Sequence, residues 1–216
     1  MVLEYFVNFS YMTIGRLIYA AAALLCMLII AGVMARRGRF SAKMLTYAAI
    51  CIALATALSF VKVFEAPFGG SVTLCSMVFI VLTGYWFGPG VGLLAGITMG
   101  LIQFVIDPYI IHPVQMFLDY PIAFGMLGLA GLFQKKKFGL YAGVLVGCAG
   151  RCAMSTLSGV IFFAEYAPPT MHPLIYSVLY NGSYIGAEMI ITMVIITVPV
   201  IRSAIQIVQK QAISAA

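Results

Sequence analysis

Charged residues are scarce in this sequence. Only 8% of its 216 residues are Asp, Glu, Lys or Arg, whereas 63% are hydrophobic, and the mean hydropathy is +1.09. Soluble globular domains have roughly 25% charged and 45–50% apolar residues. The shortage of charge therefore excludes a soluble domain and predicts an all-α, polytopic bundle of transmembrane helices.

Catalytic and nucleotide-hydrolysing motifs are also missing. The chain has no GxxxxGK[ST] phosphate loop, no HExxH and no GxSxG. We therefore expect neither an enzyme nor a cofactor. Energy for uphill transport would have to come from a partner protein or from an ion gradient.

Metal ligands are few, with two histidines and five cysteines. Cys148 and Cys152 are four residues apart and share a helix face, but Arg151 beside them would repel a cation. We expect no metal site and interpret the cysteines as small buried side chains.

Acidic residues number six against twelve basic ones, which gives a net charge of +6. The basic residues lie in short loops between apolar runs rather than on an exposed domain, so we expect no nucleic-acid partner.

Seven apolar runs meet or nearly meet the length of about 20 residues that a membrane-spanning helix needs. They cover residues 14–35, 44–64, 71–87, 90–106, 114–133, 139–163 and 174–201. The first is too long for the apolar region of a signal peptide and ends in a basic segment, 36–39. We therefore predict seven membrane helices.

The loop charges support this count. With seven helices and the N-terminus outside, every basic cluster falls in the cytoplasm, as the positive-inside rule requires. The clusters are Arg36, Arg37, Arg39 and Lys43, then Lys135, Lys136 and Lys137, then Arg202 and Lys210. We expect a multi-pass protein of a bacterial plasma membrane with a cytoplasmic C-terminus.

Ionisable residues inside the predicted helices are Asp119, Arg151 and Glu188. Such groups usually face the interior of a bundle. Arg151 and Glu188 lie at similar depth, so they could form an ion pair or take part in transport. Asp119, beside Tyr120 and before Pro121, could hold a cationic or amino-bearing ring. Alternatively, Asp119 pairs with Arg151 and Tyr120 only packs.

Aromatic and amide residues gather near the predicted outer ends of the last two helices. They include Phe163, Tyr176 and Asn181. Tyrosines at this depth can simply form an interfacial belt, but an amide about two turns into a helix needs hydrogen-bond partners. Together with Asp119, these residues predict a site for a flat, polar heterocycle.

Small residues repeat every fourth position along the second predicted helix, at Ala49, Ala53 and Ala57. This spacing permits close approach of another helix, either within the chain or from a partner subunit.

Four stretches together resemble the thiamine-specific S components of energy-coupling factor (ECF) transporters. These stretches are 67–74, 112–124, 159–168 and 176–182. The resemblance implies a six-helix membrane subunit that captures thiamine outside and works with a transmembrane coupling subunit and two ATPases. It also implies that the alanine face docks on the coupling subunit.

The same resemblance implies which residues bind the ligand. The family's acid–tyrosine pair falls on Asp119 and Tyr120, and the other positions fall on Ser155, Gly159, Phe163, Tyr176 and Asn181. Two of these depart from the family pattern, because Ser155 replaces a histidine and Phe163 replaces a tryptophan. The ligand could therefore be thiamine, its pyrimidine precursor or a related heterocycle.

The resemblance divides the chain into an extra N-terminal helix with a basic loop, 1–43, and a six-helix binding domain, 44–216. An alternative function is a self-sufficient, proton-coupled transporter in which Asp119, Arg151 and Glu188 relay protons. The absence of an apparent inverted repeat counts against that alternative.

Overall fold

A computed structural model describes Glu4 and residues 41–213 of the chain. The predicted first membrane helix, 14–35, and the expected position of the N-terminus lie outside the described residues.

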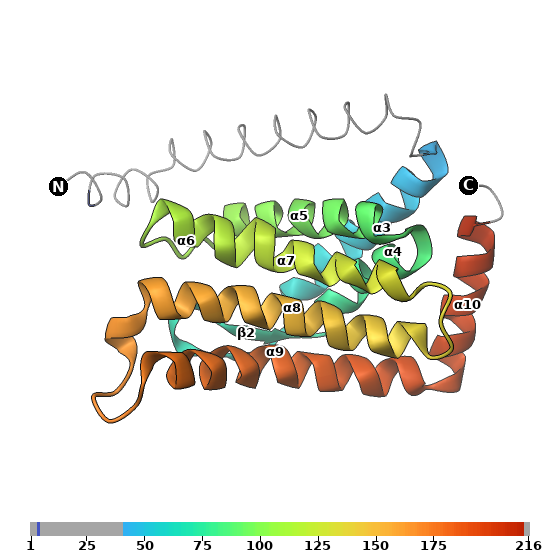
Figure 1. Cartoon of the computed structure of the whole chain (residues 1–216). Helices are drawn as coiled ribbons and strands as arrows, with labels where there is room; N and C mark the ends of the chain where they lie inside the picture. The colour runs from blue at the N-terminus through green and yellow to red at the C-terminus, as the bar shows by residue number, and fades with distance from the viewer. Residues whose placement is uncertain (1–3, 5–40, 214–216) are drawn as a thin grey trace.

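The described helices pack as an elongated bundle (Figure 1). Among the described residues, five segments are long and apolar enough to cross a membrane: α3 (Ala42–Ser59), α5 (Pro89–Ile106), a broken helix (Pro113–Phe133), α8 (Gly139–Phe162) and α9 (Pro173–Thr197). A sixth, α4 (Ser76–Phe87), is apolar but has only 12 residues. The prediction of a polytopic helical membrane protein is confirmed, and these six segments correspond to the predicted core.

The sequence prediction was wrong between residues 60 and 75, which it assigned mostly to helix ends. An antiparallel hairpin occupies this stretch, formed by β1 (Lys62–Glu65) and β2 (Ser71–Thr73). The turn η1 (Pro67–Gly69) joins the strands, and Gly69 has a φ of +94°, which glycine adopts without strain. Val61, Val63 and Phe64 continue the apolar run of α3, but their β-branched and aromatic side chains suit a strand.

The last predicted helix, 174–201, is in fact two helices. α9 ends at Thr197, and α10 (Pro199–Ile213) begins at a proline that has no N–H to continue the hydrogen-bond ladder of α9. In Figure 1, α10 runs across the end of the bundle beside the start of α3. There the Lys43 ammonium donates to the carbonyl of Gln211 at 2.7 Å.

The broken helix changes its geometry along its length. It comprises α6 (Pro113–Phe117), a π-helical turn η2 (Leu118–Ile122), α7 (Ala123–Met126) and a 3-10 segment η3 (Leu127–Phe133). Pro121 lies inside the π-helical turn, a feature that often marks functional sites. α5 packs directly on this turn, because a Cβ on Gly100 would lie 2.3 Å from the carbonyl oxygen of Tyr120.

Glycines also bring α4, α5 and η3 into close contact. A Cβ on Gly92 would lie 2.5 Å from Cα of Gly84 and 2.8 Å from Cα of Gly128. Backbones that approach this closely leave no room for larger side chains. These glycines therefore allow α4, α5 and the η3 part of the broken helix to pack closely against one another.

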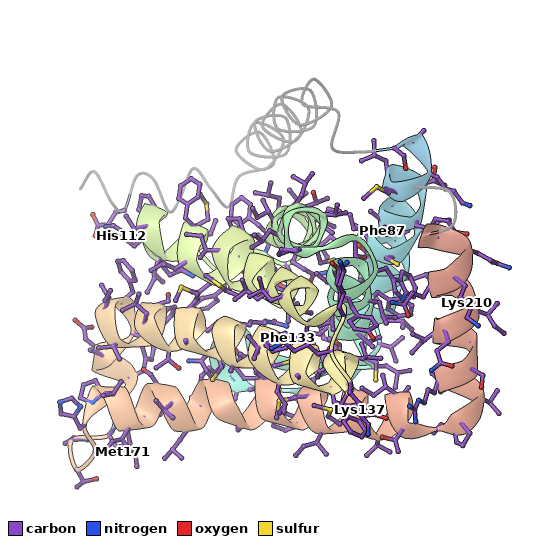
Figure 2. The ribbon with its side chains drawn as sticks, turned by 45° about the vertical axis from the view of Figure 1, so that its right-hand side comes forward. Phe87, His112, Phe133, Lys137, Met171 and Lys210 are labelled. Carbon is purple, nitrogen blue, oxygen red and sulfur yellow. The ribbon has the colours of Figure 1, made fainter. Side chains whose placement is uncertain are left out.

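The loops separate by charge along the bundle. Figure 2 shows His112 and Met171 at one end and Lys137 and Lys210 at the other. The acidic loop residues Asp107 and Glu165 follow α5 and α8 at the His112 end. This distribution is the one that the positive-inside argument predicted.

Candidate functional site

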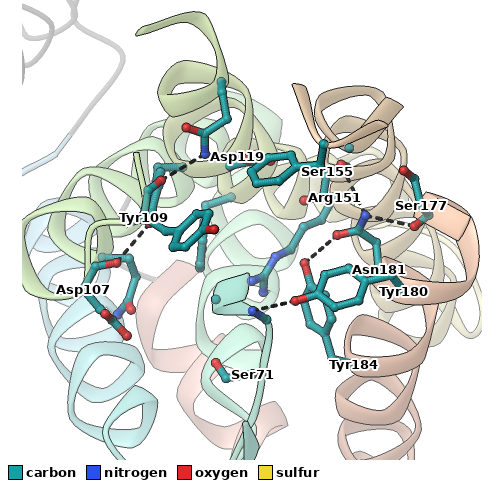
Figure 3. Close-up of a pocket in the computed structure, with 18 of the residues that line it drawn as sticks. Ser71, Asp107, Tyr109, Asp119, Arg151, Ser155, Ser177, Tyr180, Asn181 and Tyr184 are labelled. Carbon is teal, nitrogen blue, oxygen red and sulfur yellow. Dashed lines mark hydrogen bonds between the residues drawn. The ribbon is translucent and has the colours of Figure 1, made fainter. Parts of the chain in front are cut away.

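A cavity of about 310 Å³ lies among the hairpin, α5, the broken helix, α8 and α9. Figure 3 shows the polar and aromatic side chains that converge on it. All of the predicted ligand-binding residues line this cavity: Asp119, Tyr120, Ser155, Gly159, Phe163, Tyr176 and Asn181. The fold therefore brings together residues from three separate segments that the sequence placed only in rough proximity.

Asp119 projects from the π-helical turn and is partly buried. Its Oδ2 accepts hydrogen bonds from Nε2 of Gln115 (2.7 Å) and Oγ of Ser158 (2.9 Å). No other described residue donates to this carboxylate. One oxygen thus orients the side chain, and Oδ1 remains available to a ligand.

Tyr120 fastens the loop between α5 and α6. Its hydroxyl accepts from the backbone N–H of Tyr109 (2.7 Å) and donates to the carbonyl of Asp107 (3.0 Å). Its ring meets Phe104 edge-on, with centroids 5.4 Å apart. Tyr120 therefore shapes the cavity wall in addition to lining it.

Asn181 has a fixed amide orientation. Its Nδ2 donates to the carbonyls of Ser177 (2.9 Å) and Ser155 (3.3 Å), and its Oδ1 accepts from the Tyr184 hydroxyl (2.7 Å). Carbonyl oxygens only accept hydrogen bonds, so the nitrogen must face them. Asn181 can therefore offer a ligand only the remaining acceptor capacity of its oxygen.

Aromatic rings form two stacked pairs on the cavity wall. Tyr176 and Tyr180 stack along α9 with centroids 6.1 Å apart, and Phe163 stacks on Tyr109 at 5.9 Å and 24°. All four residues line the cavity. Such faces suit a flat aromatic or cationic ring.

Gly159 and Ser155 lie where α8 approaches α9. A Cβ on Gly159 would lie 2.6 Å from Oγ of Ser177 and 3.5 Å from Nδ2 of Asn181. Ser155 is buried and contributes its carbonyl to Asn181. Both residues therefore support the position of the amide.

Arg151 also lines the cavity, and its guanidinium carbon lies 4.1 Å from the centroid of the Phe124 ring. Between described residues it forms no ion pair with Asp119 or Glu188, so neither pairing suggested by the sequence is present. The cation–π contact with Phe124 instead holds the guanidinium beside the cavity.

The rim of the cavity carries the ion pairs found between described residues. The Lys62 ammonium lies 2.8 Å from Glu65 and 3.0 Å from Asp107. Hydrogen bonding to Glu65, and then to Asp107, raises the pKa of Lys62 above its usual value. The second pair links the hairpin to the end of α5.

Sequence reasoning missed several lining residues. Gln115 is four residues before Asp119, so its helical spacing could have identified it as a partner of the carboxylate. Gly70 and Ser71 belong to the hairpin, whose strands were not predicted, and Tyr184 was not singled out. Within the described part of the chain, no group of His, Cys, Asp or Glu residues has a geometry that could hold a metal ion.

The fold and the cavity define a class of protein: a polytopic helical membrane protein with a polar, aromatic binding cavity near one end of its bundle. Residues 45–208 match the family model described as Thiamine transporter protein (Thia_YuaJ), and the chain belongs to this family of bacterial multi-pass membrane proteins. It is accordingly a transporter protein rather than an enzyme.

Curated relatives agree with this assignment. The chain is 33% identical to the thiamine transporter ThiT of Bacillus subtilis over 144 residues, which cover 60% of this chain and 74% of the relative. It is 29% identical to ThiT of Lacticaseibacillus paracasei over 121 residues, covering 48% and 60% respectively.

A solved structure of ThiT from Listeria monocytogenes has the same fold. It superposes with a TM-score of 0.65 over 72% of this chain and 91% of that chain, at 22% sequence identity.

Proposed function

We propose that the chain is the substrate-binding subunit of a vitamin uptake transporter, which captures thiamine outside and delivers it inward with an ATP-driven ECF module. The observation that carries the proposal is the convergence of all the predicted ligand-binding residues on one cavity. The names of its relatives support thiamine as the substrate.

The available oxygen of Asp119 would receive a positive charge or an exocyclic amine. The oxygen of Asn181 would accept a hydrogen bond from a ring substituent. Phe163 and Tyr176 would stack on flat rings, and Tyr120 would hold the wall that carries Asp119. Thiamine, which combines an aminopyrimidine with a cationic thiazolium, satisfies these requirements.

The alanine face of α3 supports docking to an ECF coupling subunit. Ala49, Ala53 and Ala57 are exposed in the described part of the chain, whereas Ala48 and Ala55 on the same helix are buried. A row of small exposed residues permits close packing by a helix of another protein. In this arrangement the His112 end of the bundle faces outside, and α10 lies in the cytoplasm.

The proposal is tested by isothermal titration of the purified, detergent-solubilised chain with thiamine. Calorimetry is preferable to tryptophan fluorescence, because the one tryptophan, Trp86, does not line the cavity. We expect 1:1 binding without any partner. A folded protein that does not bind thiamine overturns the proposed substrate, and titration with the pyrimidine precursor then follows.

Proton-coupled transport without a partner is the competing function. Its proposed relay includes Glu188, but both oxygens of that carboxylate already accept hydrogen bonds from protein groups. Uptake in proteoliposomes distinguishes the two functions. We expect thiamine accumulation only with ATP and a coupling module, and accumulation driven by a proton gradient alone would support the alternative.

A further inference from the structure

Glu188 is a buried carboxylate outside the cavity. It lies in the C-terminal half of α9 and is only 2% exposed. Between described residues, no basic side chain lies within 4.0 Å of it. An acidic group at this depth is costly in a bilayer unless the protein satisfies it.

Glu188 accepts hydrogen bonds from the last residue of β2 and from the first two residues of α4. Its Oε2 accepts from the backbone N–H of Thr73 at 3.2 Å. Its Oε1 accepts from Oγ of Ser76 at 3.0 Å and from the backbone N–H of Met77 at 3.1 Å. A side chain from one membrane helix thus binds the start of another.

α4 needs this external acceptor. The residue before it, Cys75, has a φ of +59° and makes no side-chain capping bond. The first N–H groups of a helix have no partner within the helix, and they form the positive end of its dipole. Glu188 therefore supplies from α9 the cap that the local sequence lacks.

α9 also holds the turn of the hairpin. The Tyr180 hydroxyl accepts from the backbone N–H of Gly70 at 3.1 Å and donates to the carbonyl of Pro67. A Cβ on Gly70 would lie 2.8 Å from the ring of Tyr184. Tyr180, Tyr184 and Glu188 are four residues apart, so they form one row along the helix.

The side chains of Tyr180, Tyr184 and Glu188 hold the hairpin against α9, and the hairpin forms part of the cavity wall. Gly70 and Ser71 line the cavity together with Tyr180 and Tyr184, whereas Glu188 lies further along α9 and does not. We propose that Glu188 is a positioning residue for ligand retention, because it anchors the end of β2 to α9 and thereby holds Gly70 and Ser71 over a bound ligand. The proposal rests on the proposed function, in that the cavity holds thiamine.

The test compares ligand dissociation from three single variants of the full chain in detergent. Glu188→Gln replaces one acceptor oxygen with a donor that faces other donors. Ser76→Ala removes one of the three bonds and leaves the carboxylate in place. Ile196→Val is the control, because Ile196 lies two helical turns beyond Glu188 on α9, is equally buried and does not line the cavity.

Radiolabelled thiamine is bound and chased with unlabelled ligand. We expect dissociation to accelerate about tenfold in Glu188→Gln and about threefold in Ser76→Ala. Ile196→Val should stay within about twofold of the wild type. Wild-type dissociation rates in both variants overturn the proposal, even if their melting temperatures fall, since a purely structural role lowers stability without changing ligand release. Should Glu188→Gln not fold, the rate of Ser76→Ala decides.

A second readout needs no ligand. Hydrogen–deuterium exchange of the unliganded protein should be faster at the amides of Thr73 and Met77 in Glu188→Gln than in the wild type. If the wild type does not bind thiamine, the proposed function fails, and this exchange still tests the anchoring. Equal exchange in variant and wild type overturns it.

Discussion

The hydroxyl of Tyr184 donates a 2.7 Å hydrogen bond to Oδ1 of Asn181. Because the amide nitrogen of Asn181 is bound to the carbonyls of Ser155 and Ser177, the group is held on three sides. A flipped amide would place its oxygen against two carbonyl oxygens. Asn181 should therefore select a ligand that donates an N–H and reject one that presents an oxygen.

Removal of the Tyr184 hydroxyl should relax this selectivity. In Tyr184→Phe, we expect the preference for thiamine over an analogue with an oxo group in place of the pyrimidine amine to fall about threefold to tenfold. Competition binding measures this ratio. Tyr180→Phe is the matched control, because that hydroxyl binds the hairpin and not Asn181. Its loss should weaken both ligands in parallel, and an unchanged ratio in Tyr184→Phe contradicts the role of Tyr184.

The charge of Asp119 should contribute directly to affinity. In Asp119→Asn, we expect thiamine binding to weaken by about 1–3 kcal/mol, because a hydrogen bond to a charged acceptor is lost. Titration calorimetry measures the change. Glu165→Gln removes a carboxylate from an exposed loop at the same end of the bundle and should bind like the wild type. Equal affinities for Asp119→Asn and the wild type would remove Asp119 from the site.

Gly159 should not accept even a methyl group. In Gly159→Ala, the added Cβ meets Ser177 at 2.6 Å and pushes α9 away from α8. We expect a loss of about 1–3 kcal/mol in stability together with weaker binding, measured by thermal unfolding and calorimetry. In Gly182→Ala the new Cβ meets no atom within 4 Å, so this variant should keep the stability and the thiamine affinity of the wild type. A fully active Gly159→Ala protein would contradict the close approach of the helices.

The alanine face should affect transport but not ligand binding. Ala53→Leu places a large side chain on the exposed face of α3, away from the residues that line the cavity. We expect wild-type thiamine affinity for the isolated chain and a loss of uptake when it is co-expressed with a coupling module. Normal uptake by this variant would exclude the face around Ala53 as the docking surface.

Much of the candidate site could be predicted because its residues occur in short, recognisable stretches. Asp119, Tyr120 and Asn181 stood out as polar groups inside apolar runs, and the structure brings them to one cavity. The hairpin could not be predicted in the same way. Its first residues include the apolar Val63 and Phe64, which continue the apolar run of α3, and hydropathy alone does not separate a strand from a helix end.

The ion pairs were the least predictable feature. Arg151 lies at a similar depth to Glu188, yet it packs on Phe124, and Glu188 bonds the start of α4. Depth in the membrane follows from position along each helix. The direction in which each side chain points depends on how the helices are rotated against one another, which neither local hydropathy nor spacing contains.

The sequence by itself determined that the chain lies in a membrane, where α5, the broken helix and α8 begin and end to within a residue, and which end of the bundle is basic. These properties follow from hydropathy, proline and glycine positions and loop charge, all of which act locally. Only the tertiary structure decided how Asn181 is oriented, where Arg151 lies and what Glu188 binds. The reason is physical: these side chains are satisfied by groups from other segments, and the bond between Glu188 and Thr73 spans 115 residues.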